Sequence, residues 1–184
     1  MILDVNFLLR VGAALLVAGV ISFLSTPLVK HLAQKFGAMD IPRDNRRMHD
    51  HPIPRMGGLA IFVGFLLSTL IFSRGLDQGQ QSILLGSIVI VILGVFDDKS
   101  SLRAKLKLVV QILAASIVVF YGDLRIDRIT NPFGSSLYSY WDLGVFSYPL
   151  TILWIVAITN AVNFIDGLDG LACGVSLNGR YYRR

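Results

Sequence analysis

Charged residues are scarce in this sequence: they make up 16% of its 184 residues, whereas hydrophobic residues make up 54%. The mean hydropathy is +0.64. A soluble domain of this length needs far more charge to cover its surface. The composition therefore argues against an ordinary soluble protein and predicts a membrane protein.

Cysteine is almost absent too, because Cys173 stands alone. One cysteine permits neither an internal disulfide nor a thiolate metal site, and we expect Cys173 to be a packing residue. The N-terminus lacks a basic region before its first apolar run and has no evident small-residue cleavage site. We therefore interpret the first apolar segment as a retained transmembrane helix, not as a signal peptide.

Five apolar runs predict transmembrane helices, since a span needs about 20 apolar residues, with a range of about 17–25. They cover Val11 to Val29, Gly57 to Ser73, Ser82 to Phe96, Leu108 to Gly122, and Phe146 to Phe164. The third and fourth runs reach this length if their polar ends are included. The predicted fold is an all-α polytopic transmembrane bundle, a single membrane domain over residues 1–184.

A sixth helix begins after Gly170, and the sequence then ends in a basic segment, residues 180–184. We interpret this ending as a truncation of a larger fold; the alternative is a basic cytoplasmic cap.

Lysine and arginine predict the orientation, because cytoplasmic loops are enriched in them. Segments 30–56 and 97–107 hold ten of these residues, whereas segments 74–81 and 123–145 hold three. The first two should be cytoplasmic loops and 123–145 an outer loop of a multi-pass membrane protein. Bases placed between apolar runs, in a chain of net charge +5, favour membrane lipids and phosphorylated substrates as partners over nucleic acid.

The outer loop contains a short predicted β-like segment. Residues 125–129 predict a strand, and residues 131–134 predict a turn after it.

Two adjacent carboxylates, Asp97 and Asp98, follow the third apolar run directly. Charged residues at a membrane boundary are costly and tend to be functional, and a bound cation would relieve their mutual repulsion. Mg²⁺ usually takes one or two carboxylates together with substrate phosphates. The alternative is a solvated start of a loop, and position alone does not decide between the two.

Lys107 and Gln111 lie four residues apart and would share one face of a helix. The two carboxylates could also reach that face, where Lys107 could hold a phosphate as a point charge. The alternative is a lysine that snorkels to the membrane surface. That alternative is the preferred interpretation of three neighbouring bases, Lys99, Arg103 and Lys105.

Arg55 precedes Gly57 and Gly58 at a predicted helix start, where it could contact a phosphate. His49 and His51 in the same loop are weaker signals.

Asn160, Asn163 and Asp166 recur every three residues and so share one helical face. Asparagine can ligate a metal or bind a nucleotide. Gly167 and Gly170 would end the helix and let the backbone approach a ligand closely. The alternative is a satisfied helix cap.

These motifs, in this order, resemble the polyprenyl-phosphate N-acetylhexosamine-1-phosphate transferases. The matching residues are Asp97, Asp98, Leu102, Lys107 and Gln111, followed by the motif that runs from Asn160 to Leu171. The segment 49–58 resembles the WecA- and TagO-like branch of the family more than MraY. The resemblance runs from about residue 20 to about residue 175.

The resemblance implies a bacterial membrane enzyme of ten or eleven helices. Such an enzyme transfers a sugar 1-phosphate, here expected to be GlcNAc-1-phosphate, from a UDP-sugar to undecaprenyl phosphate and releases UMP. The reaction initiates a lipid-linked glycan of the cell envelope, such as a teichoic acid or an O-antigen. Association into a homo-oligomer stays open.

The expected site residues take four roles on a cytoplasmic face. Asp97 and Asp98 are expected to be catalytic, Lys107 and Arg55 to bind phosphate, Asn160, Asp166 and Asp169 to bind the nucleotide, and Asn163 and Asp98 to place Mg²⁺, with Mn²⁺ as an alternative ion.

Two later features of the family have no match in this sequence: a Gly-Asp-x-Gly-Ser-like loop with a principal metal ligand, and a loop that contains His and Arg. We therefore expect the 184-residue chain on its own to be inactive. Two other functions stay open, a small transporter or ion-pathway protein and a prenyl-transferring membrane enzyme. A transporter's charges should fall in mid-helix, whereas these cluster at one membrane face.

Overall fold

The structure is a computed structural model that describes residues 5–40, 53–54, 56–73, 75–131 and 139–165. Helices dominate the described residues. The α-helices are α1 (Val5–Phe36), α2 (Gly57–Phe72), α3 (Gln78–Lys99), α4 (Ala104–Ser116) and α5 (Ser147–Ile165). A π-helical turn, η1 (Ile117–Tyr121), continues α4, and a 3₁₀ turn, η2 (Gly144–Phe146), leads into α5.

Four helical segments are long and apolar enough to cross a membrane: Val5–Phe36, Gln78–Lys99, Ala104–Tyr121 and Gly144–Phe164. The apolar helix α2 has 16 residues, about 24 Å at 1.5 Å per residue, which is shorter than a hydrocarbon core of about 30 Å. Large apolar side chains such as Phe23 and Phe164 are 79% and 85% exposed. Outward-facing apolar side chains suit a lipid environment, and the predicted helical membrane bundle is confirmed.

Small residues let neighbouring helices approach closely. A Cβ atom added to Gly64 of α2 would lie 2.4 Å from the carbonyl oxygen of Ala18 in α1. Ser68, one turn further along α2, donates a hydrogen bond of 2.7 Å to the Ala14 carbonyl. A Cβ atom added to Gly86 of α3 would lie 3.1 Å from the carbonyl oxygen of Ala114 in α4. Contacts of this kind stabilise helix pairs in lipid, where no hydrophobic effect drives helices together.

A capping box starts α3. The Asp77 carboxylate accepts a hydrogen bond of 2.7 Å from the Gln80 backbone N–H, and the Gln80 side chain accepts one of 3.3 Å from the Asp77 N–H. This reciprocal pair satisfies donors that a helix start otherwise leaves unpaired. Next to it, the Tyr121 hydroxyl donates to the Gln81 side chain at 2.7 Å and ties the start of α3 to the end of η1.

Two antiparallel two-stranded sheets connect helix ends. They are formed by β1 (Met39–Asp40) with β2 (Ile53–Pro54), and by β3 (Arg128–Thr130) with β4 (Tyr140–Asp142). The first sheet was not predicted from the sequence. The second confirms a β-like segment before the last span.

The strand predicted over 125–129 starts later than expected, at Arg128. The preceding backbone is engaged elsewhere, because the Ile126 N–H donates to the Thr151 hydroxyl at 2.9 Å. Asp127 still follows the register of the hairpin, since its carbonyl accepts from the Leu143 N–H at 2.9 Å. Most of the predicted turn at 131–134 lies outside the described residues.

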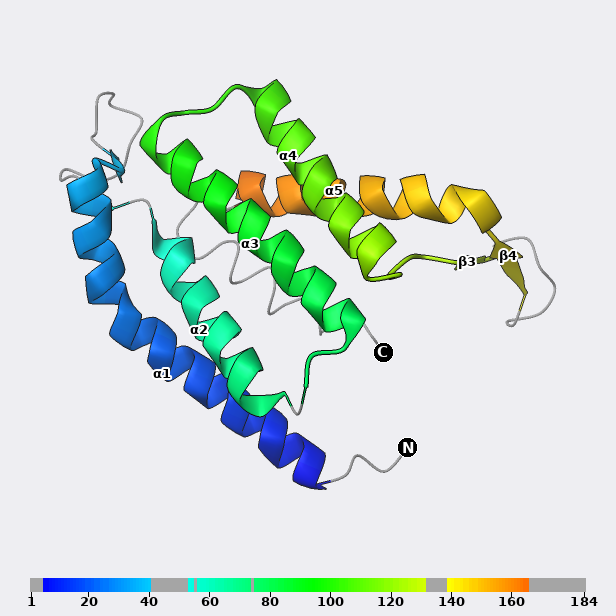
Figure 1. Cartoon of the computed structure of the whole chain (residues 1–184), viewed down its shortest axis with the longest axis horizontal. Coiled ribbons are helices and arrows are strands. Elements are labelled where there is room, and N and C mark those ends of the chain that lie inside the picture. The colour runs from blue at the N-terminus through cyan, green and yellow to red at the C-terminus, as the bar shows by residue number, and fades with distance from the viewer. Residues whose placement is uncertain (1–4, 41–52, 55, 74, 132–138, 166–184) are drawn as a thin grey trace.

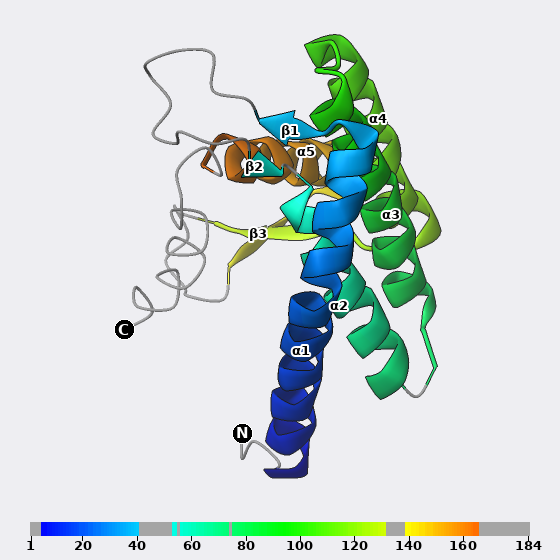
Figure 2. The ribbon, with the colours of Figure 1, turned by 90° about the vertical axis from the view of Figure 1, so that its left-hand side faces the viewer.

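The helix ends define two ends of the bundle (Figure 1). The ends of α1, α3 and α5 and the starts of α2 and α4 gather at the upper left, which we call the Asp97 end. The β3–β4 hairpin, η1 and the start of α5 lie at the right and form the hairpin end. Figure 2 looks toward the Asp97 end and shows β1, β2 and the end of α5 there.

The loops at the Asp97 end are shorter than predicted. The helix α1 extends to Phe36, so the predicted loop 30–56 begins with helix. The predicted loop 97–107 is mostly helical as well, because α3 ends at Lys99 and α4 begins at Ala104.

Candidate functional site

An ion pair joins α3 to α4 at the Asp97 end. Asp97 lies in the last turn of α3 and Lys107 in the first turn of α4, and Lys107 Nζ is 2.6 Å from Asp97 Oδ2. The other carboxylate oxygen accepts a hydrogen bond of 2.8 Å from the Leu102 N–H. Because no side chain caps the start of α4, Asp97 fixes both the backbone that enters this helix and a cation in its first turn.

The ion pair lines a cavity of about 470 Å³ between α3, α4 and α5. Both side chains are partly buried, with 30% of Lys107 and 28% of Asp97 exposed. Gln111 and Asn163 contribute carboxamides to the same cavity. A cation and amides around one space can bind a phosphate group and orient it, and the carboxylate holds the cation in place.

The helix α5 brings two predicted asparagines to this region. Asn163 lines the cavity and is exposed. Asn160, one turn earlier, bonds directly to α4: its Nδ2 donates to Gln111 Oε1 at 2.7 Å and to the Val156 carbonyl at 2.8 Å. Gln111 Nε2 donates back to Asn160 Oδ1 at 3.4 Å.

The remaining predicted site residues are placed in part. Asp98 follows Asp97 within α3 and is half-buried, but it does not line this cavity. Arg55, Asp166 and Asp169 lie outside the described residues. The structure thus brings Asp97, Lys107 and Asn163 to one cavity. Gln111 of α4 also lines this cavity and contacts α5.

The donor atoms of this cavity suit Mg²⁺ only as a partial ligand set. Across the residues that the structure describes, no three His, Cys, Asp or Glu side chains converge as a metal site. Mg²⁺ usually keeps several waters and takes one or two carboxylates together with substrate phosphates. The oxygens of Asp97 and Asn163 around one cavity fit that mode, in which the substrate supplies further ligands.

A second cavity of about 470 Å³ adjoins the first, and the two share Ile90, Gln111 and Thr159. The second cavity is lined mainly by apolar side chains, among them Phe62 and Val118. The polar space at the Asp97 end therefore continues into an apolar space between the helices.

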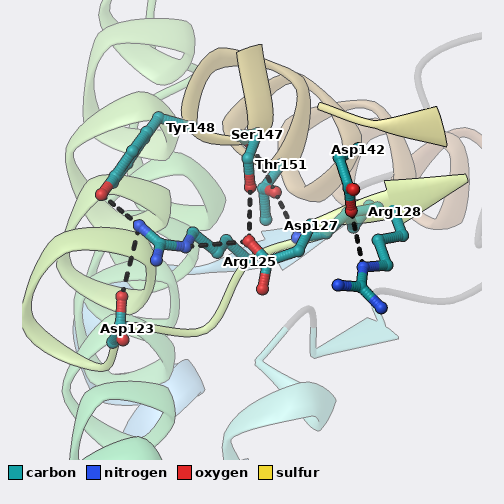
Figure 3. Close-up of polar contacts among 9 residues, drawn as sticks. Asp123, Arg125, Asp127, Arg128, Asp142, Ser147, Tyr148 and Thr151 are labelled. Carbon is teal, nitrogen blue, oxygen red and sulfur yellow. Dashed lines mark hydrogen bonds and ion pairs between the residues drawn. The ribbon is translucent and has the colours of Figure 1, made fainter. Parts of the chain in front are cut away.

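The hairpin end holds a separate cluster of charges around Arg125 (Figure 3). Arg125 donates to Asp127 Oδ1 at 3.0 Å and to the Tyr148 hydroxyl, and it lies 3.5 Å from Asp123 Oδ1. Its guanidinium also stands 4.7 Å from the centre of the Tyr148 ring. Desolvation acts to lower the pKa of Arg125, but Asp123, Tyr148 and Asp127 outweigh it and raise the pKa above its usual value.

The same cluster fixes the start of α5. Buried Ser147 donates to Asp127 Oδ1 at 3.2 Å, and buried Thr151 accepts from the Ile126 N–H. Arg128 bridges to Asp142 across the hairpin at 2.6 Å. Sequence reasoning missed this network, and the only local signal for it was the spacing of Arg125 and Asp127.

Comparisons with known proteins give the chain its relatives. The model of a family described as glycosyl transferase family 4 matches residues 80–180. A probable undecaprenyl-phosphate N-acetylglucosaminyl 1-phosphate transferase of Bacillus subtilis (strain 168) is 44% identical over 172 residues, which are 94% of this chain and 47% of that protein.

The names of two further relatives specify different transferred groups. A decaprenyl-phosphate N-acetylglucosaminephosphotransferase of Mycolicibacterium smegmatis is 38% identical over 170 residues, 88% of this chain and 41% of that protein. A phospho-N-acetylmuramoyl-pentapeptide-transferase of Heliobacterium modesticaldum is 33% identical over 175 residues, 89% of this chain and 54% of that protein. The chain spans about half the length of the curated relatives it matches.

Proposed function

Because the chain belongs to glycosyl transferase family 4, we propose that its protein transfers an N-acetylhexosamine 1-phosphate from a UDP-sugar to undecaprenyl phosphate or a similar polyprenyl phosphate. Relatives named for undecaprenyl and decaprenyl phosphate support the acceptor, and two relatives named for N-acetylglucosamine support GlcNAc-1-phosphate as the transferred group. The observation that carries the proposal is the Asp97–Lys107 pair, which lines one cavity with Asn163 inside the segment that matches the family.

The proposed reaction exchanges one phosphoanhydride bond for another. An oxygen of the lipid phosphate attacks the phosphorus that carries the sugar, and the bond from that phosphorus to the bridging oxygen breaks. UMP leaves with the bridging oxygen, and the lipid carries a sugar diphosphate. Initiation of a cell-envelope glycan, such as a teichoic acid or a lipopolysaccharide O-antigen, is the proposed use of this product.

Positioning and charge matter more here than removal of a proton. A phosphate monoester has a second pKa of about 6, so most of the acceptor is already a dianion near pH 7. The larger obstacle is the approach of one anion to another, which a fixed cation reduces. Lys107 is such a cation, and Asp97 holds its ammonium at 2.6 Å.

The other proposed roles follow the ligand types. Mg²⁺ would screen the phosphate charges and stabilise the leaving UMP. The proposed residues that place the ion are Asn163, which lines the cavity together with Asp97, and Asp98, which follows Asp97 in α3. Mn²⁺ is an alternative ion. Asp166 and Asp169 are proposed to contact the nucleotide, and Arg55 a phosphate.

The adjoining apolar cavity supports a lipid acceptor. With a phosphate between Lys107 and Asn163, a polyprenyl chain could leave past Gln111 along apolar walls such as Phe62 and Val118. This arrangement keeps the charged head at the Asp97 end and the hydrocarbon between the membrane-spanning helices.

The proposed location is the bacterial inner membrane, with the Asp97 end in the cytoplasm, where UDP-sugars are made. The ten-to-three excess of bases in the segments 30–56 and 97–107 supports this orientation. Family membership favours a transferase over the transporter and the prenyl-transferring enzyme considered from the sequence. The inactivity expected for the 184-residue chain on its own stays a prediction.

A transfer assay tests the function. The intact protein in detergent is mixed with undecaprenyl phosphate, UDP-GlcNAc and Mg²⁺, and both UMP and the lipid product are measured. We expect UMP and lipid-linked GlcNAc diphosphate in equal amounts, with neither formed when the lipid or the metal is omitted. UMP release that does not depend on the lipid would contradict the proposal.

A further inference from the structure

Gln111 and Asn160 form a reciprocal amide pair between two membrane-spanning helices. Each carboxamide both donates to and accepts from the other, at 2.7 Å and 3.4 Å. Gln111 is 7% exposed, so this contact is shielded. Buried amides of this kind are costly unless they are hydrogen-bonded, and a hydrogen bond between helices within lipid contributes measurably to their association.

The orientation of the two amides is fixed by the surrounding backbone. Asn160 Nδ2 also lies 2.8 Å from the Val156 carbonyl oxygen. That oxygen can only accept, so the Asn160 atom facing it must be the amide nitrogen. The Gln111 atom 2.7 Å from this amide nitrogen must then be Oε1 of Gln111. Both hydrogens on Asn160 Nδ2 therefore have acceptors.

The pair stands one helical turn from two residues of the proposed site. Gln111 follows Lys107 by four residues on α4, and Asn160 precedes Asn163 by three residues on α5. Lys107 and Asn163 line the same cavity from these two helices. Within the described residues, no other side-chain hydrogen bond joins α4 to α5.

We infer that Gln111 and Asn160 are positioning residues: their amide pair sets the spacing of Lys107 and Asn163 across the cavity. This inference rests on the proposed function. The sequence suggested nucleotide binding for Asn160, whereas this inference makes Asn160 a contact between α5 and α4. The reason is that two acceptors already engage its amide nitrogen. A misplacement of about 1 Å in an active site can cost 10²-fold in rate, so a pair that holds Lys107 and Asn163 in place can control the reaction.

The first test measures the spacing itself, without any turnover. Spin labels at Lys105→Cys and Phe164→Cys, both exposed positions near the Asp97 end, report the distance between α4 and α5 in the intact protein without its native cysteines. We expect one narrow distance distribution in the parent protein, and a broader or shifted one after Gln111→Met or Asn160→Leu. An unchanged distribution in both variants would overturn the inference, whether or not the protein proves to be a transferase.

The second test measures the rate of UMP release by the same variants. Each single variant should lower kcat about 10- to 100-fold, as the loss of residues that orient a ligand usually does, with a small change in the KM for UDP-GlcNAc. The swapped double variant Gln111→Asn/Asn160→Gln keeps both amides and should recover much of the rate and the narrow distribution. A folded swap variant as slow as the single variants would overturn the inference.

Gln81→Met is the matched control. Gln81 also accepts an interhelical hydrogen bond, from Tyr121, but at the hairpin end. Its loss should lower thermal stability and leave both kcat and the α4–α5 distance as in the parent. If Gln81→Met lowers kcat as much as Gln111→Met does, the effect is general destabilisation and the positioning role is wrong. Absence of lipid-dependent UMP release from the parent protein would instead refute the proposed function.

Discussion

The Asp97 end and the hairpin end both carry ion pairs, but the surroundings of these pairs differ. The Asp97–Lys107 pair is partly buried and faces a cavity lined from three helices. The Arg128–Asp142 pair is mostly exposed, with 67% and 74% of the two side chains accessible. Arg125, in the same region, is enclosed by partners that tie a loop to the start of α5.

The difference shows that charge near a membrane boundary does not by itself mark a reactive site. At the hairpin end, cations and carboxylates neutralise each other and hold backbone segments in place. At the Asp97 end, the carboxylate presents a cation to a cavity that three helices line and that adjoins an apolar cavity. The hairpin end also has a cavity, of about 710 Å³, but residues of one loop, the hairpin and the start of α5 line it. Substitutions at the hairpin end should therefore act on stability, and substitutions at the Asp97 end should act on the reaction.

The largest effect is expected from Asp97→Asn and Asp98→Asn in the intact protein. Each should lower the rate of transfer at least about 10²-fold, because groups that organise transition-state charge carry effects of this size. Binding of the UDP-sugar, measured by calorimetry, should change far less. A parent-like rate in either variant at saturating Mg²⁺ would remove that residue from the mechanism.

Lys107→Gln should slow transfer about 10- to 100-fold, because it removes the cation from the cavity and leaves Asp97 without this partner. Lys107→Arg should recover only part of the rate, since a planar guanidinium does not replace a compact point charge. Lys105→Gln is the control: Lys105 lies two residues away, is exposed and does not line the cavity. Equal losses in the Lys105 and Lys107 variants would point to general surface charge.

Gly64→Ala tests the close packing of α2 against α1. The added Cβ would lie 2.4 Å from the Ala18 carbonyl, and overpacking of this kind costs about 1–3 kcal/mol. Thermal unfolding in detergent should show the loss. Gly19→Ala, at an open position of α1, should be neutral or slightly stabilising, so a loss of similar size there would contradict the close contact.

The smallest effect is expected from Arg128→Ala at the hairpin end. An ion pair this exposed contributes about 0–1 kcal/mol, and it lies far from the cavity at the Asp97 end. Thermal stability should shift little, and the transfer rate should stay at the parent value. A rate loss comparable to that of Lys107→Gln would break the contrast between the two ends.

The sequence predicted those features that depend on local periodicity. Apolar runs located the helices, and the three-residue spacing placed Asn160 and Asn163 on one helix, α5. The adjacent carboxylates were expected at a helix end, and α3 does end at Lys99, just after them. A position for Lys107 within reach of the carboxylates was also expected, and its ion pair with Asp97 agrees with that expectation.

The features that the sequence did not predict depend on how helices pack. The Gln111–Asn160 pair joins residues 49 positions apart, and no local pattern links them. The contacts of Arg125 with Tyr148, and of Ile126 with Thr151, likewise form only when α5 folds back onto the loop after η1. These contacts explain why β3 starts at Arg128 and not at Arg125.

The account depends most on which compartment each end faces, because the proposed donor is a nucleotide sugar made in the cytoplasm. Single cysteines at Ser101, in the loop between α3 and α4, and at Thr130, in β3, sit at exposed positions of the two ends. They would be introduced into the intact protein without its native cysteines and treated in whole cells with a membrane-impermeant thiol reagent. We expect labelling of Thr130→Cys in whole cells, and of Ser101→Cys only after the membrane is permeabilised. Labelling of Ser101→Cys from outside would place the Asp97 end away from the UDP-sugar and contradict the account.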